Sequence, residues 1–437
     1  MKEENLMEKL ISLSKQRGFI YQGSEIYGGL AGTWDYGPLG VALKKNIENL
    51  WWKRFVLDRE DMYGIDAAIL MNPEVWKASG HVQGFADPLV ECEKCKKRFR
   101  GDQLEDKNKC PDCEGKVGEE RQFNMMFKTH VGATEDEDSI SYLRPETAGG
   151  MFVNFKNVLD SFHPKLPFGL AQIGKAFRNE IAPRDFIFRV RELEQMEIEY
   201  FVKPDDWKEY FEHFRKQVWE YIEEVGINIK NVYELEVGDE ARAHYSKRTI
   251  DFEFDFPFGR KELYGLAYRT DFDLGAHSNA SKADLSFYDE EKKERFIPHC
   301  IEPSFGVGRT ILAILTTAYT EDKMGGEKRV YLKFSPKVAP VKIAVFPLLK
   351  NKEKLIEKAR EVFSILKKEF GDVLFDDNGN IGKRYRRQDE IGTPYCVTID
   401  FDTIEKDNTV TVRDRDTGKQ ERIKIENLIE FLKEKFS

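Results

Sequence analysis

The spacing of apolar positions along the 437-residue chain alternates between a helical and a strand-like period. Residues 205–225 show the helical period most clearly, because one stripe of that segment is apolar throughout. Asp205 or Asp206 can cap the start of this helix, and Gly226 can end it. The apolar stripe consists of Trp207, Phe211, Phe214, Val218 and Ile222.

Two more helices are predicted over 1–19 and 39–57, and strands are predicted where the apolar period shortens to two. The strands are expected at 66–71, at 249–257 and at 261–268. Antiparallel-type strands that alternate with helices in this way favour an α+β domain.

The order of elements changes after residues 336–341, which have the composition of a linker. A strand, a long helix closed by Gly371, a second strand, a basic helix, a third strand, a hairpin and a last helix follow. They predict a compact α/β domain of about a hundred residues. The elements with clear bounds are expected at 341–349, 352–370, 373–377, 394–400 and 425–436, with the hairpin turning at 416–418.

Composition is that of a globular protein, with 41% hydrophobic and 34% charged residues, and the length favours two or three domains. No apolar run approaches the length of a membrane span, and residues 1–19 lack the apolar core of a signal peptide. We therefore expect a cytoplasmic protein with no membrane contact. A net charge of −9 argues against a strongly basic protein that coats nucleic acid.

Positive charge is concentrated towards the C-terminus. Residues 341–437 carry 20 Lys and Arg against 19 Asp and Glu, whereas the first 340 residues carry 49 against 59. The densest basic cluster is 383–387, Lys-Arg-Tyr-Arg-Arg. Such a cluster is either a solvated helix face or a local contact surface for a polyanion.

The stretch 177–197, FRNEIAPRDFIFRVRELEQME, is the strongest candidate for a functional site. Side chains alternate between the two faces of a strand, so Arg178 and Glu180 are expected to share a face. Arg189, Leu193 and Glu197 follow at steps of four and are expected to line one face as well. A face that runs cation, apolar, anion suits a phosphate, a flat base and an ammonium group in a row. The alternative is the solvated face of a half-covered sheet.

A second segment, 302–309, favours the functional interpretation. Glu302 and Ser304 share a strand face, and the glycines at 306 and 308 allow a tight turn into an apolar helix. Arg309 then lies at the start of that helix, where the peptide dipole disfavours a cation. An arginine in that place indicates that an anionic ligand binds there.

Four cysteines form two close pairs, Cys92-x2-Cys95 and Cys110-x2-Cys113, separated by 14 residues. This spacing is typical of tetrahedral zinc, and the polar residues between the pairs cannot build a core without a metal. Two disulfides or four free thiols are the alternatives. The remaining cysteines, at 300 and 396, lie in apolar contexts and are expected in the core.

In these motifs the chain resembles the class II aminoacyl-tRNA synthetases, and within them the homodimeric glycyl-tRNA synthetases. The resemblance covers nearly the whole length. It rests on WDYGPLG at 34–40, NPEVWKASGH at 72–81, RPETA at 144–148, and on FRNE, RVRELEQME and EPSFGVGR.

The resemblance implies an α+β fold with an antiparallel catalytic sheet, flanking helices, an inserted four-cysteine lobe and a C-terminal α/β anticodon-binding domain. The catalytic domain is expected over 1–338 and the anticodon-binding domain over 339–437. Within the catalytic domain, motif 1 is expected at about 39–73, the cysteine insertion at about 88–120, motif 2 at 177–201, a further insertion at about 202–248 and motif 3 at 302–315.

The implied reaction has two steps, in which glycine first attacks the α-phosphorus of ATP and the glycyl-adenylate then charges the 3′-terminal adenosine of tRNA(Gly). ATP with Mg²⁺, glycine, tRNA(Gly) and a second copy of the chain, held through motif 1, are the implied partners. Arg178 and Arg309 are the implied catalytic residues. The implied ATP-binding residues are Arg178, Asn179, Glu180, Phe188, Arg189, Leu193, Glu262, Leu263, Gly306, Gly308 and Arg309. The implied glycine-binding residues are Arg100, Glu146, Leu193, Glu197, Glu302, Ser304 and Gly306.

One position departs from the family pattern. Leu193 stands where the family usually has a phenylalanine that stacks on adenine, which removes on the order of 1 kcal/mol of stacking. Single residues also have structural alternatives, since Glu146 can be a helix cap and Arg269 can pair with Asp271. The seven histidines show no ligand spacing and are given no chemistry.

Two other functions stay open. The chain could be a class II synthetase for threonine, proline, serine or histidine, although RPETA and EPSFG argue against that. It could also be a catalytically silent relative that only binds nucleic acid, although such a protein should have lost a phosphate-binding arginine. In the C-terminal domain the candidate anticodon contacts are Arg384, Arg386, Arg387, Arg413 and Arg415.

Overall fold

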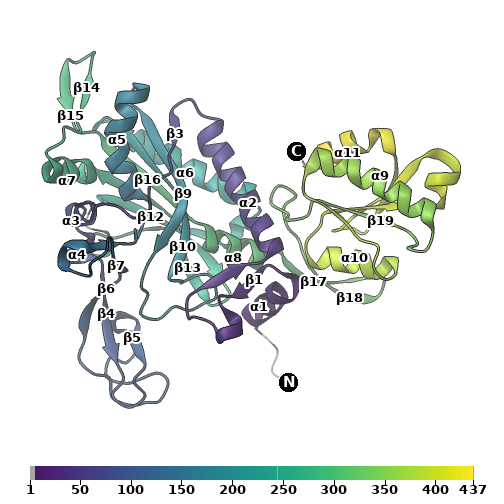
Figure 1. Cartoon of the computed structure of the whole chain (residues 1–437), viewed down its shortest axis with the longest axis horizontal. Coiled ribbons are helices and arrows are strands. Elements are labelled where there is room, and N and C mark those ends of the chain that lie inside the picture. The colour runs from purple at the N-terminus through teal and green to yellow at the C-terminus, as the bar shows by residue number, and fades with distance from the viewer. Residues whose placement is uncertain (1–4, 244, 437) are drawn as a thin grey trace.

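The computed structural model describes residues 5–243 and 245–436, and it confirms the α+β class. Its centre is a seven-stranded sheet in the order β11-β12-β13-β16-β10-β9-β3 (Figure 1). Neighbouring strands are antiparallel except β3 and β9, which are parallel. The strands span Met62–Gly64 (β3), Phe168–Phe177 (β9), Glu192–Val202 (β10), Val232–Glu236 (β11), Arg248–Phe256 (β12), Gly259–Thr270 (β13) and His299–Gly306 (β16).

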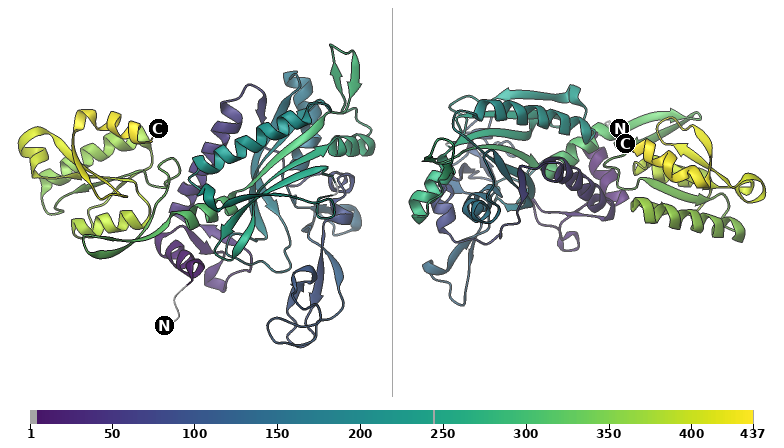
Figure 2. Two further views of the ribbon diagram at one scale, coloured as in Figure 1. Left: turned by 180° about the vertical axis from the view of Figure 1, so that it is seen from behind. Right: turned by 90° about the horizontal axis from the view of Figure 1, so that it is seen from above.

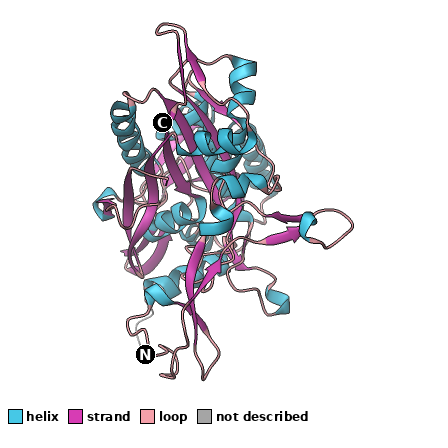
Figure 3. Ribbon diagram, turned by 90° about the vertical axis from the view of Figure 1, so that its left-hand side faces the viewer, coloured by secondary structure: helices cyan, strands magenta, loops and turns pink. Residues whose placement is uncertain are grey.

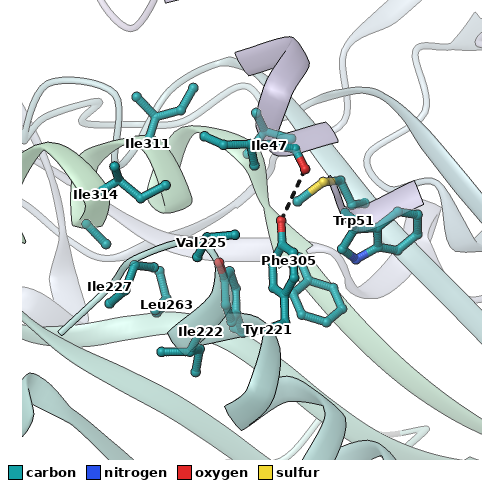
Figure 4. Packing of buried hydrophobic residues seen from close by; sticks show 14 of the residues in the cluster. Ile47, Trp51, Tyr221, Ile222, Val225, Ile227, Leu263, Phe305, Ile311 and Ile314 are labelled. Carbon is teal, nitrogen blue, oxygen red and sulfur yellow. Dashed lines mark hydrogen bonds between the residues drawn. The ribbon is translucent and has the colours of Figure 1, made fainter. Parts of the chain in front are cut away.

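Helices cover both faces of this sheet, whose strands twist as Figure 3 shows. The larger core lies under three helices, where Phe305 of β16 packs between Trp51 and Tyr221 with ring centroids 6.0 and 5.4 Å apart (Figure 4). The Tyr221 hydroxyl donates to the Ile47 carbonyl at 3.4 Å. These helices are α2 (Pro38–Trp52), α6 (Trp207–Glu224) and α8 (Val307–Ala318), with α1 (Leu6–Arg17) beside them; α5 (Ala148–Phe162) and α7 (Phe272–Ser281) cover part of the other face.

Most helices and strands predicted from periodicity are confirmed. The predicted helix 39–57 is α2 continued by a π-helical turn, Lys53–Leu57, and β12 and β13 match the two predicted strands. The helix α6 starts after Asp206, whose side chain makes no capping hydrogen bond, and ends before Gly226, which has φ of +83°. The predicted N-terminal helix begins at Leu6 behind an Asn5–Glu8 capping box, and residues 1–4 lie outside the described part.

The predicted strand at 66–71 is wrong. The strand β3 comes earlier, and 66–71 is a loop with one isolated bridge from Leu70 to Leu143. Ile69 and Leu70 are 37% and 49% exposed, so the apolar run that mimicked a buried strand faces outwards. Periodicity alone cannot distinguish a buried apolar run from an exposed one.

Several small elements lie outside the seven-stranded sheet. The cysteine lobe and the C-terminal domain stand on opposite sides of it, as both views in Figure 2 show. The lobe contains β4 (Ala86–Glu91), β5 (Arg98–Arg100) and β6 (Arg121–Asn124). The other small elements are β1 (Ile20–Gln22), β2 (Trp34–Tyr36), α3 (Glu74–Ala78), α4 (His81–Gly84), β7 (Lys128–His130), β8 (Ile140–Tyr142), β14 (Phe287–Asp289), β15 (Glu294–Phe296), β17 (Tyr319–Met324) and β18 (Glu327–Leu332).

Residues after the β17–β18 hairpin form a five-stranded sheet in the order β20-β19-β21-β22-β23, with its own hydrophobic core. The strand and helix order agrees with the prediction for this segment. The strands are Ile343–Pro347 (β19), Val373–Phe375 (β20), Tyr395–Ile399 (β21), Thr409–Asp414 (β22) and Gln420–Lys424 (β23), and the helices are Glu353–Phe370 (α9), Ile381–Glu390 (α10) and Leu428–Phe436 (α11). Among the described helices, none has the length and apolar content to cross a bilayer.

Candidate active site

A cavity of about 470 Å³ opens on the sheet face that α5 and α7 leave uncovered. Its floor is formed by β10, β13 and β16, and its rim by the loop 178–191 and the start of α8. Asn179 is the one predicted site residue that does not line it, because its backbone is tied to the Met125 carbonyl instead. The predicted residues that do line the cavity are Arg100, Glu146, Arg178, Glu180, Phe188, Arg189, Leu193, Glu197, Glu262, Leu263, Glu302, Ser304, Gly306, Gly308 and Arg309.

Strand pairing explains why the acidic end of the cavity forms. The strands β10 and β16 are antiparallel neighbours, and Glu197 lies directly opposite Ser304. Glu302 is two residues from Ser304 and therefore points to the same side. The Ser304 hydroxyl donates to Glu197 Oε1 at 2.7 Å, so the shared strand face that the sequence predicted is present.

Glu197 is buried and held by several donors. Gln195 Nε2 donates to its Oε1 at 2.6 Å, and the backbone N–H of Thr147 donates to its Oε2 at 3.2 Å. Burial, then the nearby charge of Glu146, raises the pKa of Glu197 above its usual range. The carboxylate is thus rigidly placed in a site that favours an added cation.

Three buried carboxylates, Glu146, Glu197 and Glu302, line this end of the cavity around one arginine. Arg269 donates from Nη1 to Glu302 Oε1 at 2.8 Å, and its Nη2 lies 4.0 Å from Glu146 Oε1. Arg269 is already engaged with both oxygens of Asp273 at 2.7 and 2.8 Å. The cluster therefore lacks positive charge, and a bound ammonium group would supply it.

The pKa values of these groups reflect the same imbalance. Burial, opposed only in part by Arg269 and reinforced by Glu197 and Glu146, raises the pKa of Glu302 to about 8. Burial acts in the same direction on Glu146, but the charge and hydrogen bond of His81 outweigh it and lower the pKa of Glu146 to about 2. The neighbouring groups thus shift the pKa values of two carboxyls of one cluster in opposite directions.

Two structural alternatives for these residues are wrong. The N-cap of α5 is Thr147 rather than Glu146, and Glu146 instead pairs with His81, Nε2 to Oε2 at 3.3 Å. Arg269 pairs with Asp273, two residues beyond Asp271, because Asp271 is exposed at the N-cap of α7. The spacing of charges in the sequence could not separate these partners.

The cationic end of the cavity is built by a loop, which corrects the expectation of an alternating strand through 177–197. The strand β9 ends at Phe177 and β10 begins at Glu192. Between them the chain makes a tight turn in which Asp185 and Phe186 have positive φ, closed by backbone bonds between Arg184 and Arg189. Turn residues of this kind interrupt strand alternation, so Arg178, Glu180 and Arg189 do not share strand faces.

The loop nevertheless brings its charges into the cavity. Arg178 donates from Nε to the Pro145 carbonyl at 3.0 Å and lies over the Phe85 ring. Arg189 Nη1 is 3.8 Å from Glu180 Oε2, an oxygen that is buried without a hydrogen-bond partner. An unpartnered buried acceptor beside a cavity indicates that a ligand donor completes it.

Arg309 lies at the first turn of α8, as predicted, and faces the same cavity. Its Nη1 is 3.0 Å from Glu262 Oε1, and its guanidinium lies 4.6 Å from the centre of the Phe188 ring. The charge of Arg309 lowers the pKa of Glu262, although burial opposes this. Gly308 is required here, because a β-carbon would lie 2.9 Å from the Ile187 carbonyl oxygen of the loop.

Several cavity residues escaped the sequence prediction. Gln195 is two residues from Glu197 and shares its strand face, so strand alternation could have predicted it. Asp251 lies on β12, and burial with the charge of Glu262 raises its pKa to about 7. His81 and Arg269 do not line the cavity but lie next to Glu146, and no sequence signal indicated these contacts because the residues come from distant segments. His244 lies outside the described residues.

The four paired cysteines meet at the tip of the lobe. Their sulfur atoms lie within 4.8 Å of one another, with Cys92–Cys113 at 3.5 Å and Cys95–Cys110 at 3.7 Å. Tetrahedral zinc–thiolate bonds of about 2.3 Å place sulfurs roughly 3.8 Å apart, so the donor set fits zinc. Gly115 leaves room for this group, because a β-carbon there would lie 3.2 Å from Cys92 Sγ and 3.3 Å from Cys113 Sγ. All six cysteines are free thiols.

Three of the five candidate anticodon contacts are buried and engaged within the protein. Arg384 donates to the carbonyls of Asp377 and Gly379. Arg413 binds both oxygens of Asp389, and Arg415 donates to carbonyls including that of Phe334. Their exposed fractions are 1%, 5% and 3%. These three predictions are wrong, because the three arginines bind carbonyl and carboxylate groups inside the domain.

Comparison with known proteins agrees with this geometry. Residues 127–318 match the tRNA synthetase class II core domain (G, H, P, S and T), and residues 342–435 match an anticodon binding domain. The chain is 50% identical to a glycine–tRNA ligase of Clostridium acetobutylicum over the full length of both chains. It is 49% identical to one of Treponema denticola over 98% of this chain and 96% of that one. The chain therefore belongs to the glycine–tRNA ligase family of class II tRNA synthetases.

Proposed function

We propose that this protein is a glycine–tRNA ligase, which activates glycine with ATP and transfers it to the 3′-terminal adenosine of tRNA(Gly). The observation that carries the proposal is one cavity with arginines at one end and three buried carboxylates at the other. An amino acid presents a carboxylate and an ammonium group, and the ATP phosphates require cations. The charges of the cavity match these groups in order.

The chemistry of the first step needs positioning and charge stabilisation more than covalent help. We assign Arg178 to the α-phosphate and the glycine carboxylate, since a guanidinium can bind both at once. Arg189 and Arg309 would hold the β- and γ-phosphates. The unpartnered oxygen of Glu180 would accept from the adenine amino group, while Leu193 covers the base.

Magnesium bound to ATP would neutralise charge on the phosphates. Glu262 lies in the cavity beside Arg309 and offers the hard oxygen that such an ion prefers. Arg309 would release Glu262 as it turns to the phosphates.

Glycine would be recognised by its ammonium group, bound among Glu146, Glu197 and Glu302. The smallest amino acid needs no favourable side-chain contact, because larger ones are excluded by overlap with a filled pocket. The pocket cannot enlarge for a bulkier amino acid without breaking the hydrogen bonds that fix Glu197.

ATP–pyrophosphate exchange with each amino acid in turn tests this function. We expect exchange with glycine and with no other amino acid, followed by charging of tRNA(Gly). Exchange with threonine, proline, serine or histidine would show a different synthetase. A complete lack of exchange would favour a silent nucleic-acid binder, although the charged set Arg178, Glu180, Arg189 and Arg309 is intact.

Zinc is the metal that the four-cysteine cluster would hold, as a closed structural site. The donor set is all thiolate, which suits zinc in a site without an open position. We expect atomic emission to find about one zinc per chain. A chelator should release this zinc, and a thiol-reactive dye should then label four newly accessible cysteines. A purified protein that binds no zinc, with these thiols already reactive, would contradict the site.

The protein is proposed to act as a homodimer through the motif 1 segment, 39–73. Apolar side chains of this segment are exposed in the single chain: Val41 44%, Leu57 69%, Ile69 37% and Leu70 49%. A large exposed apolar surface is typical of an interface. Light scattering should give twice the chain mass of 50.9 kDa. Leu57→Lys with Leu70→Lys should lower that mass, whereas Phe162→Lys, outside motif 1, should not.

We assign residues 1–338 to the catalytic domain and 339–437 to the anticodon-binding domain. The side chains of Arg386 and Arg387 on α10 are 53% and 34% exposed, so these two are the remaining candidates for tRNA contact, although Arg387 also binds Asp376. We further propose a cytoplasmic location, where ATP, glycine and tRNA(Gly) occur together.

A further inference from the structure

The first cysteine pair forms the turn of a β-hairpin that leads into the active-site cavity. The strands β4 and β5 are antiparallel, with Leu89 opposite Arg100. Cys92 and Cys95 lie in the connection between them, where the Cys92 N–H donates to the Lys97 carbonyl at 2.9 Å. A metal bound to these sulfurs therefore closes one end of the hairpin, while the other end reaches the cavity.

Arg100, the last residue of β5, lines that cavity. Its Nη1 lies 2.5 Å from Asp87 Oδ2 on β4, and its Nε and Nη2 bind the two oxygens of Asp102 at 3.1 and 2.8 Å. Its charge also acts on Glu180 and Arg189, the groups assigned to the nucleotide. The guanidinium is thus held by its own hairpin and faces the cationic end of the site.

A second contact joins the lobe to the catalytic loop. Gln103, three residues after Arg100, accepts from Arg184 Nη2 at 2.9 Å. Arg184 belongs to the turn that places Arg189. The lobe therefore touches the nucleotide side of the site at two points.

Little besides the thiols holds the lobe together. Its core has four buried residues, and two of them are cysteines of the cluster: Val90, Cys92, Cys110 and Val117. Phe99, which precedes Arg100, packs against this core. A core so small gains most of its stability from a bound metal.

We propose that the four-cysteine metal site is a positioning device for the active site, which holds the β4–β5 hairpin so that Arg100 contacts ATP. Arg100 is then an ATP contact, rather than the glycine contact that the resemblance implied, and Asp87 is a positioning residue. The inference rests on the proposed function, and it adds a role for the metal in substrate affinity. The metal of the four-cysteine site itself takes no part in the chemistry.

The test compares the zinc-loaded full-length protein with the same protein after chelation. We expect the KM for ATP in glycine-dependent exchange to rise about 10- to 150-fold, the range for losing one charged hydrogen-bonded contact, with kcat within about twofold. Hydrogen exchange should become faster in 90–104 and stay unchanged in β10 and β16. Re-addition of zinc should restore both readouts.

The variant Asp87→Asn releases Arg100 while the metal stays bound, so it should raise the KM for ATP to a similar extent. Chelation of this variant should add little, because both changes remove the same contact. Arg98→Ala is the matched control, since Arg98 lies on the same strand but pairs with Glu91 in solvent, and it should leave KM unchanged.

Three results would overturn the inference. They are an unchanged KM for ATP after chelation, a rise confined to glycine, and full additivity between chelation and Asp87→Asn. If chelation unfolds the chain, the zinc-loaded Asp87→Asn variant decides, and an unchanged KM there overturns it. Failure of the proposed function is a different result, namely no glycine-dependent exchange by the zinc-loaded parent protein.

Discussion

Replacing Arg178 by alanine should lower glycine-dependent ATP–pyrophosphate exchange by at least about a thousandfold, measured as kcat/KM for ATP. Arg178 is assigned to the group on which negative charge develops as the glycine carboxylate attacks. Its guanidinium is already fixed by the Pro145 carbonyl and the Phe85 ring, so it needs no reorganisation in the transition state. Arg309→Ala should likewise reduce exchange below detection.

Neither substitution should unfold the protein, because both side chains border the cavity rather than the core. Arg178→Lys should recover only part of the loss, since an ammonium group cannot bind two oxygens in one plane. Arg295→Ala, on the exposed β14–β15 hairpin, is the matched control and should behave as the parent. Activity of Arg178→Ala within tenfold of the parent would refute the assigned role.

Replacing Arg269 by methionine should destabilise the protein by about 3–5 kcal/mol, the usual cost of removing one partner from a buried ion pair. Arg269 is 1% exposed and binds Asp273 and Glu302. Without it, the acidic cluster keeps its negative charges in a buried site. Urea unfolding monitored by circular dichroism measures the loss.

The loss should depend on pH in a defined direction. Burial already raises the pKa of Glu302 to about 8 although Arg269 opposes it, so removing the guanidinium raises this pKa further. The destabilisation is therefore greatest above that raised pKa and shrinks as the pH falls through it. Arg260→Met is a matched control on the same strand, where an exposed pair with Asp255 contributes little to stability. Equal losses for the two variants would contradict the buried network.

Much of the fold follows from local pattern. The apolar stripe of α6, the strands β12 and β13 and the whole element order of the C-terminal domain could be predicted, because periods of 3.6 and 2 depend only on neighbours in the chain. The shared strand face of Glu302 and Ser304 follows from strand alternation in the same way, whereas the position of Glu197 opposite Ser304 depends on the pairing of β10 with β16. The exposed run at 66–71 could not be recognised, since its period does not report which side faces water.

The tertiary structure decided which charged side chains pair with one another. The sequence alone predicted most of the charged residues that line the cavity, the four-cysteine spacing and the turn from Gly306 into a helix that bears Arg309. It did not determine that Arg178 and Arg189 reach the cavity from a loop, that Arg269 binds Asp273 and Glu302, or that Arg384 is buried. These facts depend on which distant segments meet, and a charged side chain selects its partner by distance and burial rather than by position along the chain.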